Sequence, residues 1–153
     1  MRIKEISRYD ITVCDIDNTL ISGWMTDLMD WTWEKFQSPM LGKILGKVQQ
    51  VFHLYKINHT VVEALKESKY VYFLTARGPS KFLAKMLENI LPPWINWELV
   101  ELGSSYPPRD KQEWIFHNLY WDYDVVFIDD NYNNRRACRF IAKCISPGDI
   151  EEQ

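Results

Sequence analysis

The chain has 153 residues, of which 46% are hydrophobic and 25% charged, and its formal net charge is −3. This length and composition are typical of one globular domain that needs no metal or disulfide to hold its core together. The slight acidic excess argues against a strongly basic nucleic-acid-binding protein, although it leaves room for a local basic groove.

The chain contains three cysteines, Cys14, Cys138 and Cys144, and no two of them are close in sequence. An odd number of separated cysteines indicates reduced thiols. The first residues lack the apolar segment of a signal peptide, and no run approaches the roughly 18 apolar residues that span a membrane. We therefore expect a cytoplasmic protein without a membrane partner.

Short apolar runs predict buried strands at residues 11–14, 70–74, 125–128 and 140–145, with a weaker candidate at 96–102. Helical patterns separate these strands. Continuous apolar strands that alternate with amphipathic helices predict an α/β fold, a Rossmann-like three-layer sandwich with a mostly parallel sheet.

The helix starts are predicted from local signals. Thr60 and Glu63 form a capping-box pattern. Pro79 suits the first turn of a second helix. Asp110 and Glu113 form a similar pattern that predicts the start of a third helix.

Residues 21–58 interrupt the alternation of strands and helices. Their pattern is helical, and Pro39 is expected to divide it into two helices. The segment is too long for a loop in a compact domain. We expect a single domain over residues 1–153, with a small helical cap inserted at about 21–58 whose core contains aromatic residues: Trp31, Trp33 and Phe36.

Polar residues stand where three of the predicted strands end. Asp15 and Asp17 follow the first strand, Thr75 follows the second, and the third leads into Asp129 and Asp130. Ligands of open α/β sheets bind at the carboxyl ends of the strands. Taken alone, the first two aspartates would also suit a simple turn, but the other polar strand ends favour a shared site.

These residue types suit phosphate chemistry. A group of carboxylates repels itself unless a cation is present or some are protonated, and carboxylate oxygens are ligands that Mg²⁺ prefers. Lys111 and the hydroxyl of Thr75 add partners for a phosphate dianion. Asp15 can attack phosphorus to form an aspartyl-phosphate, with a metal bridging the two anions. Asp17 can protonate the leaving alcohol and then activate water.

The same residues resemble the motifs of the haloacid dehalogenase-like phosphohydrolases. DIDNTL at 15–20 resembles the DxDxT motif, and FLTARG at 73–78 resembles the second motif. Lys111 matches the lysine of the third motif, and FIDDN at 127–131 matches the acidic fourth motif. The four motifs follow the order of the family and span residues 11–148.

The resemblance implies roles for the acidic residues. Asp15 would be the nucleophile and a Mg²⁺ ligand. Asp17 would be the acid–base residue, and its main-chain carbonyl would also bind the metal. Asp129 would bind Mg²⁺ directly, and Asp130 directly or through water.

The resemblance also implies phosphate contacts. Thr75 would bind the phosphate, and Lys111 would balance its charge and that of Asp15. Further residues beside the motifs are expected to contact the substrate: Asn18, Ala76, Arg77 and Trp24. For Arg77 the alternative of a surface salt bridge stays open.

The chain departs from the family pattern at two places. Relatives often have Gly after the second aspartate of the first motif, where this chain has Asn18, a residue that also accepts left-handed backbone. Many relatives carry a further acid beyond the fourth motif. Asn133 and Asn134 stand there in this chain, so a third acidic ligand is missing from that region.

Two segments are similar to the phosphatase half of phage-type polynucleotide kinase/phosphatases: residues 57–78 and 125–150. Those enzymes remove phosphate from 3′ ends of nucleic acid, which implies a 3′-phosphorylated nucleic acid or a nucleotide as substrate. Two alternatives stay open, a small-metabolite phosphatase and a non-catalytic phosphate-binding module. Basic residues that are either solvated or part of a groove for a polyanion occur in two groups: Lys43, Lys47 and Lys56, and Arg135, Arg136 and Arg139.

Overall fold

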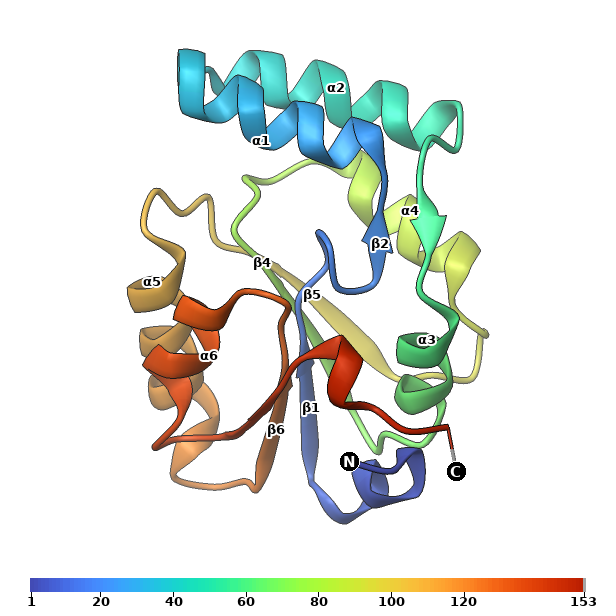
Figure 1. Ribbon diagram of the computed structural model, residues 1–153, viewed down its shortest axis with the longest axis vertical. Helices are drawn as coiled ribbons and strands as arrows, with labels where there is room; N and C mark the ends of the chain where they lie inside the picture. The colour runs from blue at the N-terminus through green and yellow to red at the C-terminus, as the bar shows by residue number, and fades with distance from the viewer. Residues whose placement is uncertain (153) are drawn as a thin grey trace.

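The computed structural model describes residues 1–152, and within them a five-stranded parallel sheet has the order β5-β4-β1-β6-β7. The strands are β1 (Ile11–Cys14), β4 (Val71–Thr75), β5 (Trp97–Glu101), β6 (Val125–Ile128) and β7 (Lys143–Ile145). Helices lie on both faces of this sheet (Figure 1). The predicted α/β three-layer fold is therefore confirmed.

The helices divide between the two faces (Figure 1). One face is covered by α3 (His59–Lys66) and α4 (Lys81–Ile90), and the other by α5 (Pro107–Ile115) and α6 (Tyr132–Cys138). A π-helical turn (Phe116–Tyr120) continues α5, and short 3₁₀ helices lie near the two ends of the chain (Ile3–Arg8 and Pro147–Asp149).

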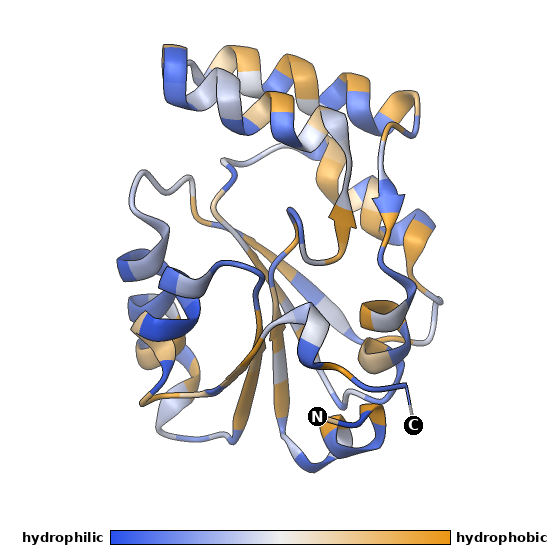
Figure 2. Ribbon diagram, in the orientation of Figure 1, coloured by the Kyte–Doolittle hydropathy of each residue, from blue (hydrophilic) through white to orange (hydrophobic). Residues whose placement is uncertain are grey.

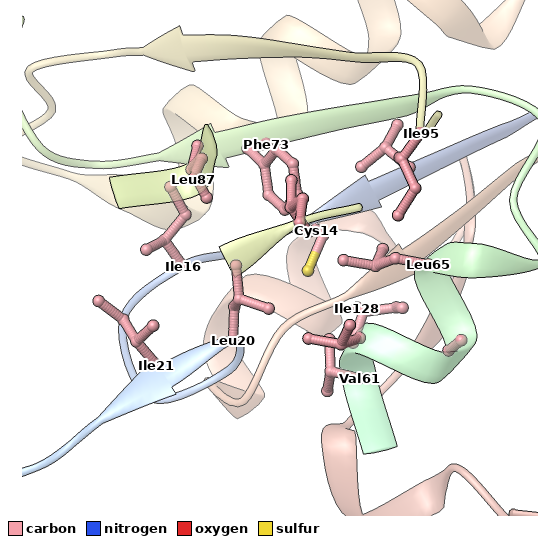
Figure 3. Packing of buried hydrophobic residues seen from close by; sticks show 14 of the residues in the cluster. Cys14, Ile16, Leu20, Ile21, Val61, Leu65, Phe73, Leu87, Ile95 and Ile128 are labelled. Atoms are coloured by element: carbon pink, nitrogen blue, oxygen red, sulfur yellow. The ribbon is translucent and has the colours of Figure 1, made fainter. Parts of the chain in front are cut away.

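Successive side chains along each strand point to opposite faces of the sheet, and this alternation produces two hydrophobic clusters. Cys14 is in register with Phe73 and Ile128, and all three pack with Leu65 of α3 in the first cluster. Figure 3 shows these side chains close together between the sheet and α3. The neighbouring strand residues point the other way and pack against α5 and α6. Apolar residues accordingly follow the strands in the hydropathy colouring of Figure 2.

The cap lies beyond the carboxyl ends of the central strands (Figure 1). It contains α1 (Trp24–Phe36) and α2 (Pro39–Val51), joined to the core by a two-stranded antiparallel ribbon, β2 (Ile21–Ser22) and β3 (Lys56–Ile57). Pro39 is the first residue of α2, where its missing N–H costs no helical hydrogen bond. The ribbon was not predicted, because two-residue strands leave no periodic pattern.

The aromatic residues of α1 are not the core of the cap, and that prediction was wrong. Trp31, Trp33 and Phe36 are all exposed, and the buried residues of α1 are Met25, Thr26 and Thr32. Two helices share only one narrow contact surface, so the cap has little room to bury large aromatic side chains, and most of them face outward.

Two predicted helix starts were displaced. The N-cap of α3 is Asn58, whose side chain accepts from the main-chain N–H of Val61, whereas the hydroxyl of Thr60 donates to Glu152. Helix α5 begins three residues before Asp110, because Pro107 is already fixed in a helical φ. Short capping patterns therefore located these helices but not their first residues.

Two further boundaries differ from the predictions. Pro79 lies before Ser80, the N-cap of α4, and is not in the first helical turn. The last strand is shorter than the apolar run at 140–145 and begins only at Lys143. Residues 140–142 instead form the turn that leads out of α6.

The cysteines are free thiols in this structure. Burial raises the pKa of Cys14 well above its usual range, and burial raises that of Cys138 to about 12 and that of Cys144 to about 11. Thiols with such pKa values are poor nucleophiles at neutral pH. No helix within residues 1–152 is long and apolar enough to cross a membrane.

The variant Leu65→Ala tests the packing of α3 on the sheet. Leu65 is fully buried in the first cluster, so we expect its truncation to lower the free energy of unfolding by about 2–5 kcal/mol. The matched change Lys66→Ala, on the outer side of the same helix, removes a surface ion pair with Glu63 and should cost at most about 1 kcal/mol. Equal losses in urea unfolding would contradict this account of the core.

Candidate active site

The alternation of side chains along the strands directs two aspartates to one face of the sheet. Asp15 follows Cys14 in β1, and Asp129 follows Ile128 in the neighbouring strand β6. Cys14 and Ile128 point towards α3, so the next residue of each strand points towards α5 and α6. Both carboxylates are buried, and they meet at the carboxyl edge of the sheet.

Lys111 lies between these two carboxylates. It is one helical turn before Ile115, which packs on the sheet, so α5 aims the lysine at the same surface. Its Nζ donates to Oδ1 of Asp15 and to Oδ2 of Asp129, each at 2.8 Å, and the residue is only 1% exposed. Burial alone lowers the pKa of Lys111, but the attraction of the two carboxylates outweighs it and raises the pKa. The ammonium therefore stays charged.

Thr19 connects Asp15 with Asp130. Its hydroxyl is 3.0 Å from Oδ2 of Asp15 and 3.2 Å from Oδ1 of Asp130, and it accepts from the main-chain N–H of Asp130 at 3.0 Å. A hydroxyl has one proton, so it donates to one carboxylate at a time. The sequence reasoning missed this contact, although the threonine belongs to the DxDxT pattern.

Asn134 is a second residue that the sequence reasoning missed. Its Nδ2 donates to Oδ2 of Asp129 at 3.0 Å, while the main-chain N–H of Asn131 donates to Oδ1 at 2.8 Å. Asn134 was considered only as the place of a missing acidic ligand. The structure instead uses it to orient the carboxylate that faces Lys111.

The carboxylates outnumber the cation that they contact. One oxygen from each of Asp15, Asp129 and Asp130 lies within 4.8 Å of the others. Burial raises the pKa of Asp15 well above its usual range although Lys111 opposes this, and burial followed by the charge of Asp129 raises that of Asp130. When all three carboxylates are ionised, they exceed the one ammonium by two negative charges. Hard oxygen donors with this excess fit a divalent cation such as Mg²⁺.

Asp17 and Arg77 form an ion pair beside this cluster. Nε of Arg77 donates to Oδ2 of Asp17 at 2.7 Å, and Nη2 donates to Oδ1 at 2.5 Å. Asn18 follows with a φ of 61°, the left-handed conformation that the sequence reasoning considered tolerable for Asn. Arg77 is therefore in a salt bridge, one of the two alternatives considered for it, but the pair is only 15% and 22% exposed and its partner is the proposed acid–base residue.

The loop after β4 is held in place by hydrogen bonds. The hydroxyl of Thr75, which is 1% exposed, accepts from the main-chain N–H of Arg77 at 3.1 Å. The carbonyl of Ala76 accepts from the main-chain N–H of Ser104, in the loop after β5, at 2.8 Å. Trp24 begins α1 in the cap, and 62% of its surface is exposed.

An arginine-rich groove lies between α5 and α6. Its volume is about 560 Å³, and its lining includes Tyr106, Arg136, Arg139 and Phe140. Arginine side chains lie over aromatic rings at three places on this side of the molecule: Arg109 over Tyr106, Arg135 over Tyr132, and Arg139 over Phe140. Each guanidinium lies within about 6 Å of its ring centroid, the range in which a cation and an aromatic ring attract each other.

No protein-family model matches this chain, and neither a curated protein nor a solved structure matches it. The case for a function therefore depends on the geometry of the cluster and on the residues that border it.

Mg²⁺ binding at the carboxylate cluster should stabilise the protein more as the pH rises above about 3.9, the ordinary pKa of an aspartate. The raised pKa values of Asp15 and Asp130 mean that the folded state retains protons there after the unfolded state has released them. Folding therefore loses stability as the pH rises through these values, and a cation offsets that loss. Unfolding with and without Mg²⁺ measures the gain, which is about 2.7 kcal/mol at 100 times the dissociation constant.

Two variants serve as controls for this measurement. Asp129→Asn removes a carboxylate of the cluster and should abolish the gain. Asp122→Asn makes the same change at an exposed position that precedes β6, near the other end of that strand, and should keep the gain. A gain that is independent of pH, or that survives in Asp129→Asn, would refute a cation site at this cluster.

Proposed function

We propose that the chain is a Mg²⁺-dependent phosphomonoester hydrolase that acts through an aspartyl-phosphate intermediate, in the manner of the haloacid dehalogenase-like phosphohydrolases. The observation that carries this proposal is the buried Lys111 between Asp15 and Asp129, at the strand edge where Thr75 also lies. Four sequence motifs of that family fall on the residues of this edge.

In the first step the carboxylate of Asp15 attacks phosphorus, and the bond between phosphorus and the leaving-group oxygen breaks. A Mg²⁺ ion held by Asp15, Asp129 and Asp130 would neutralise the charge of the two reacting anions. Lys111 favours the ionised form of Asp15 and orients it, because its ammonium donates directly to Oδ1. Thr75 and the main-chain N–H groups of the following loop supply donors for phosphate oxygens.

Asp17 moves the proton in both steps. As an acid it gives its proton to the leaving-group oxygen, so the alcohol departs neutral. In the second step it takes a proton from the water that attacks phosphorus, and the bond between phosphorus and Asp15 breaks. Inorganic phosphate leaves and both aspartates return to their starting states.

A non-catalytic phosphate-binding module is the rival of a different class. Such a module would need Lys111 for charge balance, but it would have no use for a second carboxylate held beside the first. Asp17 is nevertheless present, and Arg77 donates a hydrogen bond to each of its carboxylate oxygens. The dedication of a half-buried arginine to Asp17 favours the hydrolase.

We further propose a 3′-phosphorylated nucleic acid or a nucleotide as the substrate, rather than a small metabolite. The groove between α5 and α6 supports this choice because it offers arginines for backbone phosphates and exposed aromatic rings for base stacking. It also begins close to the carboxylate cluster in sequence, since Asn133 in its lining is only four residues from Asp129.

The variant Asp15→Asn should remain folded and lose phosphatase activity by about 10⁴-fold or more, because it lacks the nucleophile. Hydrolysis of an aryl phosphate in Mg²⁺ measures the activity, and circular dichroism checks the fold. Asp122→Asn is the matched control and should keep full activity. Substantial activity in Asp15→Asn would refute the mechanism, and a native protein that cleaves no monoester would favour the non-catalytic module.

The substrate proposal is tested with a panel of phosphates. We expect a 3′-phosphorylated oligonucleotide to be a better substrate than sugar phosphates. Reversal of charge in the groove, by Arg136→Glu with Arg139→Glu, should raise KM for the oligonucleotide about tenfold or more and leave the aryl phosphate unaffected. The same charge change at Lys69 and Lys85, which are exposed and not part of the groove, is the control. Equal KM values for native and groove-reversed protein would exclude this surface.

A further inference from the structure

Gln49 is a buried amide in the cap and the one buried residue of α2. It is 0% exposed although it belongs to α2, which forms the cap together with α1 at the outside of the molecule (Figure 1). A buried amide is costly unless both of its polar ends are hydrogen-bonded. Nε2 of Gln49 donates to the hydroxyl of Thr26 in α1 at 3.1 Å, and Oε1 accepts from Nη2 of Arg77 at 3.0 Å.

The second of these bonds joins the cap to the core. Arg77 belongs to the loop between β4 and α4, whereas Gln49 belongs to the cap. The cap also approaches the guanidinium at Gly46, where an added Cβ would be 3.9 Å from Nη1 of Arg77 and 3.8 Å from Cε of Met29. These are ordinary van der Waals distances, so they show that α2 lies directly beside the guanidinium of Arg77.

One nitrogen carries both the cap contact and a contact with Asp17. Nη2 of Arg77 donates to Oδ1 of Asp17 and to Oε1 of Gln49, while Nε donates to the other oxygen of Asp17. Because the guanidinium is planar and rigid, fixing Nη2 from the cap also fixes the plane in which the carboxylate of Asp17 is held. Thr26, Gln49, Arg77 and Asp17 thus form a continuous chain of hydrogen bonds, which we call the cap relay.

We propose that Gln49 is a positioning residue that orients the acid–base residue Asp17 through Arg77, so that seating of the cap and alignment of Asp17 are one event. This inference rests on the proposed function, because it assigns a purpose to the cap only if Asp17 transfers protons. A displacement of about 1 Å at a catalytic group can cost on the order of 100-fold in rate. The hydrogen bond between Gln49 and Arg77 can therefore affect the rate although Gln49 does not touch Asp17 itself.

The alternative is that Gln49 only joins α1 to α2 and stabilises the cap. The two roles differ in their dependence on the leaving group. An alkyl alcohol needs a proton from Asp17 as it departs, whereas a nitrophenolate departs as a stable anion and does not. A loss of Asp17 alignment therefore affects alkyl phosphates selectively, while a damaged cap affects both classes.

The test compares kcat/KM of Gln49→Leu for an alkyl phosphate and for p-nitrophenyl phosphate. This ratio covers only the steps up to formation of the phosphorylated Asp15, so the later hydrolysis by water does not enter. We expect a loss of about tenfold for the alkyl phosphate and less than about twofold for the aryl phosphate. Gln50→Leu is the matched control, since it makes the same change on the same helix outside the cap relay, and it should leave both values unchanged.

Two further variants make the result decisive. Thr26→Val removes the other anchor of Gln49 without touching Arg77, and it should give a smaller loss with the same selectivity. In an Asp17→Asn background, Gln49→Leu should have no further effect on the selectivity, because the group that it positions is absent. An equal loss for both substrates, or an undiminished effect in the Asp17→Asn background, would overturn the proposal.

Amide hydrogen exchange tests the physical coupling without turnover. If the cap relay is intact, Asp17→Asn in the core should raise exchange in α2, through Arg77 and Gln49, while Asp122→Asn should not. Unchanged exchange in α2 would overturn the coupling whatever the activity. A native protein that hydrolyses no aryl phosphate would instead refute the proposed function, and the two failures are thus distinguishable.

Discussion

The ammonium of Lys111, buried between the carboxylates of Asp15 and Asp129, is the interaction on which the rest of the site depends. Parallel strands in register force these two carboxylates together at one edge of the sheet, and burial in a low-dielectric site makes that arrangement unfavourable without a cation. Lys111 offsets part of the repulsion between these carboxylates, but Asp130 adds a further negative charge. The same excess of negative charge that makes the cluster costly to bury would attract a divalent cation.

The chemistry and its control are divided between the two parts of the fold. The sheet and α5 hold the carboxylates and Lys111 rigidly, with support from Asn134. The cap contributes no residue to that cluster, but Gln49 reaches Arg77 and through it Asp17. If Asp15 is the nucleophile and Asp17 the acid–base residue, as proposed, this division suits a site that must admit a substrate and then exclude water.

The sequence was sufficient for the features that depend on local pattern. Apolar runs located the strands, and the position of Asp15 and Asp129 directly after two of them placed both at one edge. Contacts between the cap and the core could not be predicted. Gln49 lies 28 residues from Arg77, and their pairing depends on how the cap seats on the core, which helical periodicity does not encode. The exposed Trp31 shows the same limit, because periodicity does not reveal how many neighbours a helix has.

The central claim is that Asp15 becomes phosphorylated. Rapid acid quenching of the protein during turnover in Mg²⁺, followed by mass spectrometry of its peptides, tests this directly. The account predicts phosphate on the side chain of Asp15, in a form that is lost when Mg²⁺ is withheld. Turnover of a phosphomonoester without any phosphorylated protein, or with phosphate on a different residue, would contradict it.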